Sequence, residues 1–228
     1  MTPPCRLSLV FARDAPIVVV LRRGPSRMVE VVKWQTDTDQ FEHGQWFYGR
    51  IYAERCGLSP NGSLLVYFAM KYGRVDAKNG YKQTFTAVSR PPYLTALAMW
   101  PQGDTWGGGG RFIGDHTLRL AYGAHGTSHP RVADTQICMT PAPAAHPQHQ
   151  PRGLRIETNL DQYSPDAGFL DHVTSDGAWI GTDHRGRRII VRDGRILVGD
   201  PTGGETLLKD FNGDTKRRVI SPGWARNW

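Results

Sequence analysis

The sequence predicts an all-β protein built from short antiparallel strands joined by tight turns. Of its 228 residues, 26 are glycine and 16 are proline, which exceeds average usage and indicates many turns. The apolar runs are short and rich in β-branched or aromatic residues, a composition typical of strands. Turn dipeptides such as Asn61-Gly62 and Asp193-Gly194 separate these runs and favour hairpins.

Strand candidates begin near the N-terminus. Residues 7–11 and 17–21 are apolar, and the second run, Ile-Val-Val-Val-Leu, leads into a glycine- and proline-containing turn. Residues 28–34 are expected to return as the next strand, and residues 36–40 to form a polar loop. Residues 46–52 alternate aromatic and polar side chains, which predicts a further strand.

The clearest local turn signal lies in residues 58–68. Pro60 fixes its own φ angle and Asn61-Gly62 tolerates positive φ, so the chain is expected to reverse there and enter a strand. Residues 110–120 have a similar plan, in which an aromatic residue leads into a polar turn and an alternating strand. Residues 81–89 are a strand candidate between these two units.

Two segments have weaker strand character. Residues 93–100 place Leu94, Leu97 and Ala98 at helical spacing, so a short helical turn is an alternative there. Residues 123–153 contain five prolines and four histidines with little periodicity, which predicts a long loop or linker. Within it, residues 140–151 are expected to lie on the surface or to be poorly ordered, because they have no apolar face to bury.

The best meander lies in residues 178–211. Residues 178–183, 187–192, 195–198 and 206–211 are strand candidates, separated by turns that include His184-Arg-Gly186 and Asp193-Gly194. Four antiparallel strands joined in sequence would form one small sheet. The chain is thus expected to comprise N-terminal β units (1–122), the linker (123–153) and a C-terminal meander (154–228), the first and last packed as one domain.

The turn at Ser59-Pro-Asn-Gly62 resembles the S-P-D-G turn of β-propeller blades of the TolB and WD-repeat kinds. That resemblance implies a small or irregular β-propeller-like array of antiparallel meanders; a β-sandwich is the alternative, because such turns also occur there. Residues 22–27, 44–51 and 106–110 resemble stretches of a group of uncharacterised bacterial proteins, a resemblance that implies no activity.

The sequence also limits where the protein is expected to reside in the cell and what its cysteines are expected to do. No apolar run approaches the roughly 18 residues that a membrane-spanning helix needs, and residues 1–5 lack the pattern of a signal peptide. A cytoplasmic protein without membrane association is therefore expected. The three cysteines, Cys5, Cys56 and Cys138, are widely spaced, which argues against a disulfide framework or a zinc site and favours free, partly buried thiols.

The net charge of +7 is concentrated in the first part of the chain. Residues 1–150 hold 16 Lys and Arg against 10 Asp and Glu, a difference of +6. A basic N-terminal part could bind nucleic acid. Because 22 of the 28 basic residues are arginine, composition alone explains much of the excess, and a protein or small anionic ligand is the favoured partner.

The sequence offers few candidates for catalytic or metal-binding residues. Asp37 and Asp39 share one face of an extended chain, and with Glu54 they are the candidates for acid–base work. Residues 210–214 begin like a calcium loop but lack its turn glycine and its bidentate glutamate, so no metal site is expected there. No cofactor-binding fingerprint is present.

The most suggestive residues combine arginine with aromatic rings near turns. Guanidinium groups bind carboxylates and phosphates, and aromatic faces stack on bases. On propeller-like loops such residues would line one mouth of the array, whereas in a small β protein they often fill the core. The set comprises Arg22, Arg23, Arg27, Trp34, Trp46, Tyr48, Arg50, Arg90, Trp100 and Trp106.

These observations lead to two functional hypotheses. The first is a non-enzymatic binding or scaffold module whose ligand the sequence does not identify; a nucleotide, a phosphate or a protein partner, any of them anionic, is a candidate. The second is a hydrolase-type enzyme that acts on a phosphorylated or glycosidic substrate through Asp37, Asp39 or Glu54. The enzyme hypothesis requires these carboxylates to converge in one pocket beside an arginine.

Overall fold

A computed structural model describes residues 3–24, 26–75, 78, 81–121, 154–158 and 178–227. Within these ranges strands dominate, as the sequence predicts, and the named helix, α2 (Gly223–Arg226), has four residues. The strands are β1 (Arg6–Phe11), β2 (Ile17–Arg23), β3 (Met28–Gln35), β4 (Gln40–Leu58), β5 (Leu65–Lys71), β6 (Thr84–Ser89), β7 (Ala98–Pro101), β8 (Gly110–Gly114), β9 (Thr117–Leu120), β10 (Arg155–Thr158), β11 (Trp179–Thr182), β12 (Arg188–Arg192), β13 (Arg195–Gly199) and β14 (Glu205–Asp210).

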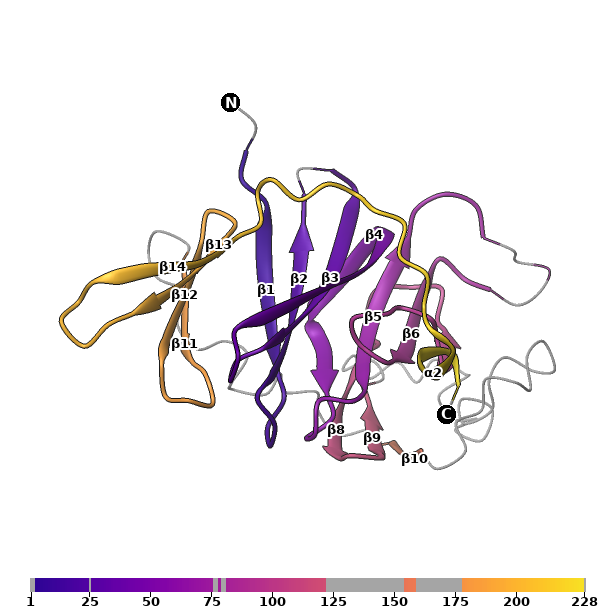
Figure 1. Ribbon diagram of the computed structural model, residues 1–228. Coiled ribbons are helices and arrows are strands. Elements are labelled where there is room, and N and C mark those ends of the chain that lie inside the picture. Colours follow the sequence, from indigo (N-terminus) through magenta and orange to yellow (C-terminus); the bar gives the residue numbers. More distant parts are fainter. Residues whose placement is uncertain are drawn as a thin grey trace.

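The main body is one seven-stranded sheet in the order β1 to β7, with every neighbouring pair antiparallel. The sheet curls into a half-barrel, so that β1 also lies against β4 (Figure 1). Two small sheets accompany it, β8–β10 and β11–β14. The all-β antiparallel prediction is therefore confirmed, and β1–β7 form a continuous sheet.

The 19-residue strand β4 connects the two halves of this sheet. Its first part pairs with β3 and its second part with β5. The alternation of aromatic and polar residues predicted a strand only at residues 46–52, which is the middle of β4. A side chain at Gly44 would meet Pro92 at 2.1 Å, and one at Gly57 would meet the backbone of Gly110 at 3.1 Å. These glycines therefore permit close approach of other segments rather than ending the strand.

The two faces of the half-barrel bury different cores. The inner core joins Val19 and Val31 of the first strands to Leu65, Tyr67 and further apolar residues of later ones. Alternate residues of the same strands point outward. Outside, β11–β14 cover β1–β3 through a core that includes Val20, Trp34 and Phe211, and β8–β9 cover β5–β7 through a core that includes Trp100 and Phe112.

The C-terminal meander is confirmed. Strands β11 to β14 pair antiparallel in sequence order, within one or two residues of the predicted bounds. Asp193 and Gly194 both have positive φ, at 50° and 72°, as a two-residue hairpin turn of the predicted kind requires. Asn212 stabilises this turn by donating its side-chain amide to the Asp193 carbonyl at 2.8 Å.

Replacing Gly194 with Ala is expected to destabilise the protein by about 2 kcal/mol, because a Cβ there adds steric conflict to the strain of positive φ. That atom would lie 2.4 Å from Asn212 Oδ1 and 2.7 Å from Cys5 Sγ. Gly203→Ala is the matched control, with φ of 91° but no heavy atom within 4 Å of the added Cβ. Urea unfolding should show a clearly larger loss for Gly194→Ala; equal losses would contradict the steric part of the prediction.

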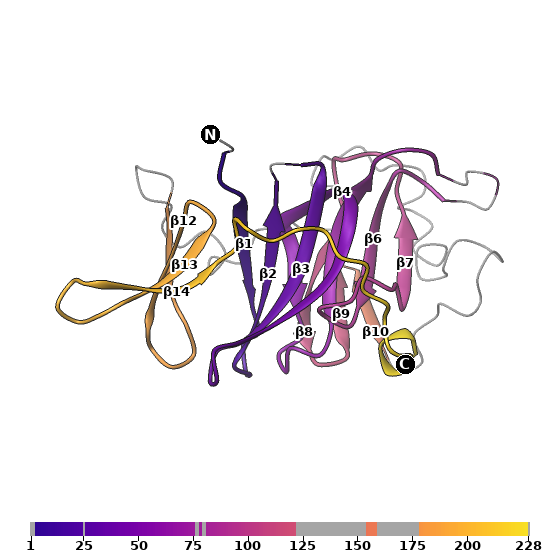
Figure 2. The same cartoon turned by 45° about the horizontal axis from the view of Figure 1, so that its top comes forward.

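After β14 the chain crosses the outer side of the half-barrel as an extended segment. We call residues 212–222 the C-terminal strap. It passes β1, β2 and β3 and leads to α2, as two views show (Figures 1 and 2). Gln45 donates its side-chain amide to the Val219 carbonyl at 3.1 Å and to Ser221 Oγ at 2.9 Å. Beyond the strap, the Trp224 ring contacts Tyr93 edge to face, although Trp224 is largely exposed.

Some expectations are corrected or lie outside the described residues. The helical turn proposed within residues 93–100 is wrong: residues 94–97 have no regular structure and β7 begins at Ala98, where it pairs with β6. The predicted linker, residues 123–153, lies entirely outside the described residues. Cys5 and Cys56 are buried free thiols, as expected, and burial raises the pKa of each.

In the described ranges, no helix is long and apolar enough to span a membrane.

Candidate functional site

Strand β4 presents a row of aromatic and arginine side chains on the outer face of the half-barrel. Trp46, Tyr48, Arg50 and Tyr52 occupy alternate positions of one regular stretch and therefore share a face. The intervening residues turn inward, where Ile51 belongs to the inner core. We call Trp46, Tyr48, Arg50 and Tyr52 the β4 row.

The middle of the β4 row is open to solvent and lies near two arginine side chains. Tyr48 is 47% exposed, and its ring contacts Tyr72 edge to face at 5.8 Å between centroids. The guanidinium of Arg27 lies 5.8 Å from the Tyr72 ring, and that of Arg50 lies 4.4 Å from the Tyr52 ring. Arg27 and Arg50 are both exposed. Neither forms an ion pair with an acidic residue in the described part of the chain.

Arg22 belongs to the fold rather than to this open surface. It is buried, with 3% of its surface exposed. Its Nε donates to the Phe211 carbonyl at 3.2 Å and its Nη2 to the Asp214 carbonyl at 3.0 Å. Its guanidinium also lies 5.2 Å from the Trp46 ring. Arg22 therefore anchors the beginning of the strap, and its donors face the protein.

The other predicted arginine and tryptophan residues do not join the β4 row. Trp34 and Trp100 are buried in the two outer cores. Arg23 ends β2 beside Arg6 of β1. Arg90 donates to the Asn227 carbonyl at 3.4 Å, near the C-terminal helix. Trp106 is 73% exposed in the loop before β8.

The candidate catalytic carboxylates are distributed along the sheet. Asp37 and Asp39 lie in the turn before β4, whereas Glu54 lies in the second half of that long strand. Asp37 is exposed and accepts the Thr38 backbone N–H at 2.9 Å. The structure therefore places Asp37 and Asp39 near one end of β4, away from Glu54.

Asp39 is part of a network that joins the turn before β4 to the C-terminal meander. Arg187 donates to both Asp39 oxygens at 2.7 Å, and Trp34 Nε1 donates to Oδ1 at 3.3 Å. Arg187 Nε also donates to the fully buried carboxylate of Asp183 at 2.8 Å. The hydrogen bonds from Arg187 lower the pKa of Asp39, so its carboxyl is ionised at neutral pH and suited to an ion pair rather than to proton donation.

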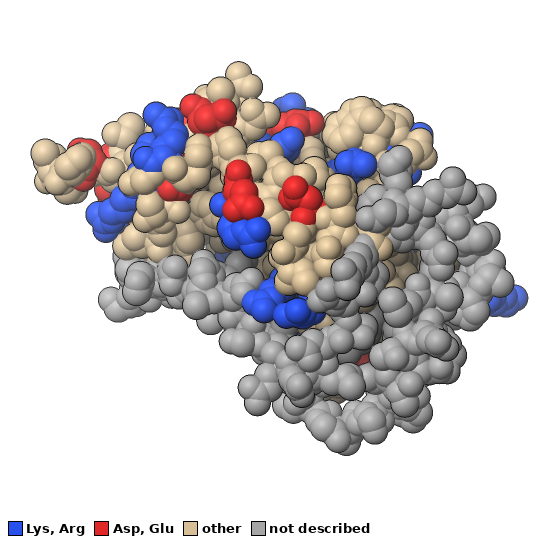
Figure 3. Space-filling model, turned by 90° about the horizontal axis from the view of Figure 1, so that it is seen from below, with Lys and Arg blue, Asp and Glu red and all other residues tan. Residues whose placement is uncertain are grey.

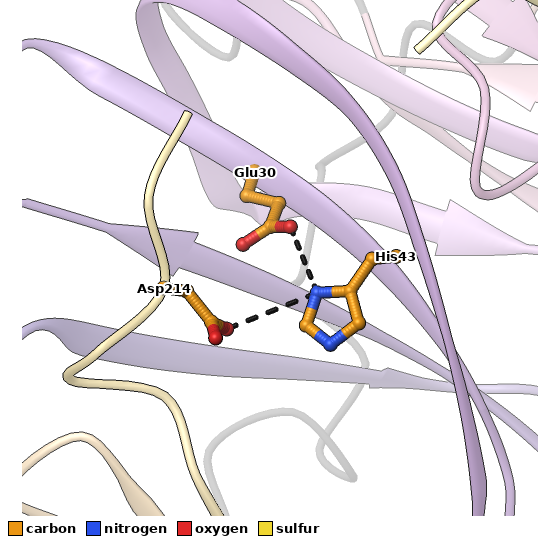
Figure 4. Close-up of side chains that lie close together, drawn as sticks. All are labelled: Glu30, His43 and Asp214. Carbon is orange, nitrogen blue, oxygen red and sulfur yellow. Dashed lines mark hydrogen bonds and ion pairs between the residues drawn. The ribbon is translucent and has the colours of Figure 1, made fainter. Parts of the chain in front are cut away.

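A second cluster escaped the sequence analysis. Glu30 of β3, His43 of β4 and Asp214 of the strap converge on the outer face (Figure 4). Arg22 lies beside them, since it pairs with Glu30 across β2 and β3 and donates to the Asp214 carbonyl. His43 Nδ1 lies 2.9 Å from Glu30 Oε1 and 3.8 Å from Asp214 Oδ2. No short motif links residues so far apart in the chain. The sequence singled out Asp214 only as the end of the calcium-loop-like residues 210–214, where no metal was expected.

Charge on the described surface is mixed. On the face shown in Figure 3, Lys and Arg side chains are interspersed with Asp and Glu. The described residues of that face therefore do not form a continuous basic patch. Arg50 of the β4 row and the nearby Arg27 stand out instead because each lies over a tyrosine ring.

Comparison of the chain with protein-family models, curated proteins and solved structures finds no match. The class that the fold and the geometry define is an all-β antiparallel protein with an arginine–aromatic surface and a histidine–carboxylate cluster. The resemblance to propeller repeats stays a prediction.

Proposed function

We propose that the protein is a non-enzymatic binding module that takes a small anionic ligand with a planar ring, such as a nucleotide, on the β4 row. The observation that carries this proposal is the exposed Tyr48 ring, which contacts Tyr72 beneath the Arg27 guanidinium. Arg50 follows on the same face of β4, where its guanidinium lies over the Tyr52 ring.

The chemistry of the row suits such a ligand. A base or another flat ring can stack on an exposed tyrosine, whose π face tolerates any base. Two guanidinium groups nearby can donate paired hydrogen bonds to phosphate or carboxylate oxygens. Because Arg27 and Arg50 rest on the tyrosine rings of the protein, part of the cost of ordering their side chains is met before binding.

The hydrolase hypothesis receives no comparable support. It rests on Asp37, Asp39 and Glu54, and the Asp39 carboxylate is held by Arg187 and Trp34. We also propose a likeness to a propeller, but only for β11–β14. These four strands pair antiparallel in sequence order, as the strands of a single propeller blade do.

Ligand binding can be measured by a thermal-shift screen of nucleotides and sugar phosphates, followed by calorimetric titration. The double variant Arg27→Gln/Arg50→Gln is expected to weaken binding at least about tenfold, because each charge-assisted contact contributes about 1 kcal/mol or more. Tyr48→Ala should weaken the binding of nucleotides more than the binding of inorganic phosphate, because the variant loses only the contact with the ring.

The matched control is Arg217→Gln/Arg218→Gln, which removes the same charge from exposed positions on the strap. Equal weakening by both double variants would show a general charge effect and contradict the site. Single-stranded DNA is expected to bind weakly and without sequence preference, with affinity that falls steeply with salt. Submicromolar affinity at physiological salt would make nucleic acid the partner instead.

A further inference from the structure

We propose that Glu30, His43 and Asp214 form a binding site for a divalent transition-metal ion of the zinc class, and that the bound ion fastens the C-terminal strap to the half-barrel. The site is separate from the β4 row and does not depend on its ligand.

The first argument is the convergence of three ligand atoms. One donor atom from each residue lies within 4.8 Å of the other two. Zinc bonds of about 2.0–2.2 Å place neighbouring ligand atoms about 3.3–3.6 Å apart in a tetrahedron. The distances from His43 Nδ1, 2.9 Å to Glu30 Oε1 and 3.8 Å to Asp214 Oδ2, bracket that separation. Small side-chain adjustments are therefore enough to close the site.

The second argument is the state of the carboxylate oxygens. Only 3% of the Glu30 side chain is exposed. Among the described residues, neither Glu30 Oε2 nor Asp214 Oδ2 has a hydrogen-bond partner. A buried carboxylate oxygen without a partner is costly, and a cation between the two groups would satisfy both.

The third argument is charge. Arg22 is the buried cation beside the cluster, and its Nε and Nη2 donate to main-chain carbonyls rather than to Glu30 or Asp214. With a neutral imidazole, the two carboxylates then outnumber the one guanidinium. One nitrogen and two oxygens are a ligand set that suits zinc or manganese, whereas calcium and magnesium prefer oxygen alone.

The backbone holds the ligands in place. The register of β3 and β4 shifts between Glu30 and Val32, so that Glu30 pairs with Trp46 and Val32 with His43. This irregularity lets His43 and Trp46 share the outer face with Glu30. Asp214 follows Phe211, whose buried ring packs near the His43 ring at 6.2 Å. In Figure 4 both carboxylates turn toward the imidazole.

The site has an accessible side. The His43 side chain is 35% exposed and that of Asp214 is 22% exposed, so an ion can enter from the strap side. Three protein ligands would leave a fourth position for water or for an anion. Because only Asp214 comes from the strap, the ion would act as a cross-link between the strap and the two strands.

The experiment uses full-length, tag-free protein stripped of metal with a chelator. Titration with zinc chloride, followed by calorimetry and metal analysis, is expected to show that the parent binds one equivalent of zinc. Substitutions at the site should abolish or weaken this binding. Glu30→Gln, His43→Gln and Asp214→Asn should each raise the dissociation constant at least about tenfold, since even a partner of a metal ligand contributes about 10–100-fold. His116→Gln and Asp37→Asn, both exposed and outside the cluster, are the matched controls and should bind as the parent does.

Trypsin supplies a readout of the cross-link, because Lys216, Arg217 and Arg218 are exposed on the strap. If cleavage requires release of Asp214, zinc at ten times its dissociation constant should slow cleavage about tenfold in the parent. Asp214→Asn, which changes the strap and leaves the sheet intact, should cleave fast with or without zinc. Unchanged zinc binding in all three variants, or absence of stoichiometric binding, would overturn the proposal and leave a hydrogen bond between His43 and Glu30.

Discussion

Arg22→Ala is expected to destabilise the protein by about 3 kcal/mol or more, the scale for removing one member of a buried polar and charged group. The change deletes two hydrogen bonds to the carbonyls of Phe211 and Asp214 and the contact with the Trp46 ring. It also removes the buried cation beside Glu30. Arg22→Lys should recover only part of the loss, because a single ammonium cannot reproduce the planar fork.

Urea unfolding at neutral pH measures this effect. The control is Arg23→Ala, which removes the same charge at the next residue, where the side chain is only partly buried. Arg23→Ala is expected to cost less than about 1 kcal/mol, as for most surface substitutions. Equal losses for the two variants would show that net charge, rather than the anchoring of the strap, determines the effect.

Arg187→Ala is expected to have a similar effect, also about 3 kcal/mol, because it leaves the buried carboxylate of Asp183 without its guanidinium. It also removes both hydrogen bonds to Asp39 and one to the Thr36 carbonyl. The neighbouring exposed residue gives the control, Arg188→Ala. A loss no larger than in that control would contradict the structural role of the network.

The effect of Arg187→Ala should depend on pH through Asp39. The folded-state pKa of Asp39 lies below its ordinary value of 3.8, because Arg187 donates hydrogen bonds to the ionised carboxylate. The ion pair therefore contributes its full stabilisation when the pH is above the ordinary, unfolded-state pKa of Asp39. The contribution is lost as the pH falls through the lower, folded-state pKa. Unfolding measured from pH 7 to below pH 3 should show the difference in stability between the parent and the variant narrowing at the acid end by the Asp39 part of the effect, while the part due to Asp183 and Thr36 remains.

The elements that sequence reasoning located best are those defined by local signals. The hairpin at Asp193-Gly194 requires two successive residues that accept positive φ, and the sequence supplies both. Alternation predicted residues 46–52 as a strand. The continuity of β4 could not be read locally, because Gly44 and Gly57 are present for contacts with Pro92 and Gly110, which lie far along the chain.

The candidate site was predicted in part, for a similar reason. Arg27, Tyr48 and Arg50 have the residue types of an anion site and lie near predicted turns, so residue type and position pointed to them. Arg22 has the same residue type, but the strap that buries it is almost 190 residues away. Glu30, His43 and Asp214 meet only through the irregular pairing of β3 with β4 and the path of the strap, neither of which has a local signature.

The path of the strap bears on the order in which the chain can fold during synthesis. Each strand from β2 to β7 pairs with the strand before it, so the half-barrel can assemble as residues leave the ribosome. The outer face of β1–β3 has no such local partner: Val20 and Trp34 are covered by Ile189 and Phe211, which are made much later. We therefore expect nascent chains that end before residue 189 to expose this apolar surface and to bind chaperones, and chains that include the strap to be released.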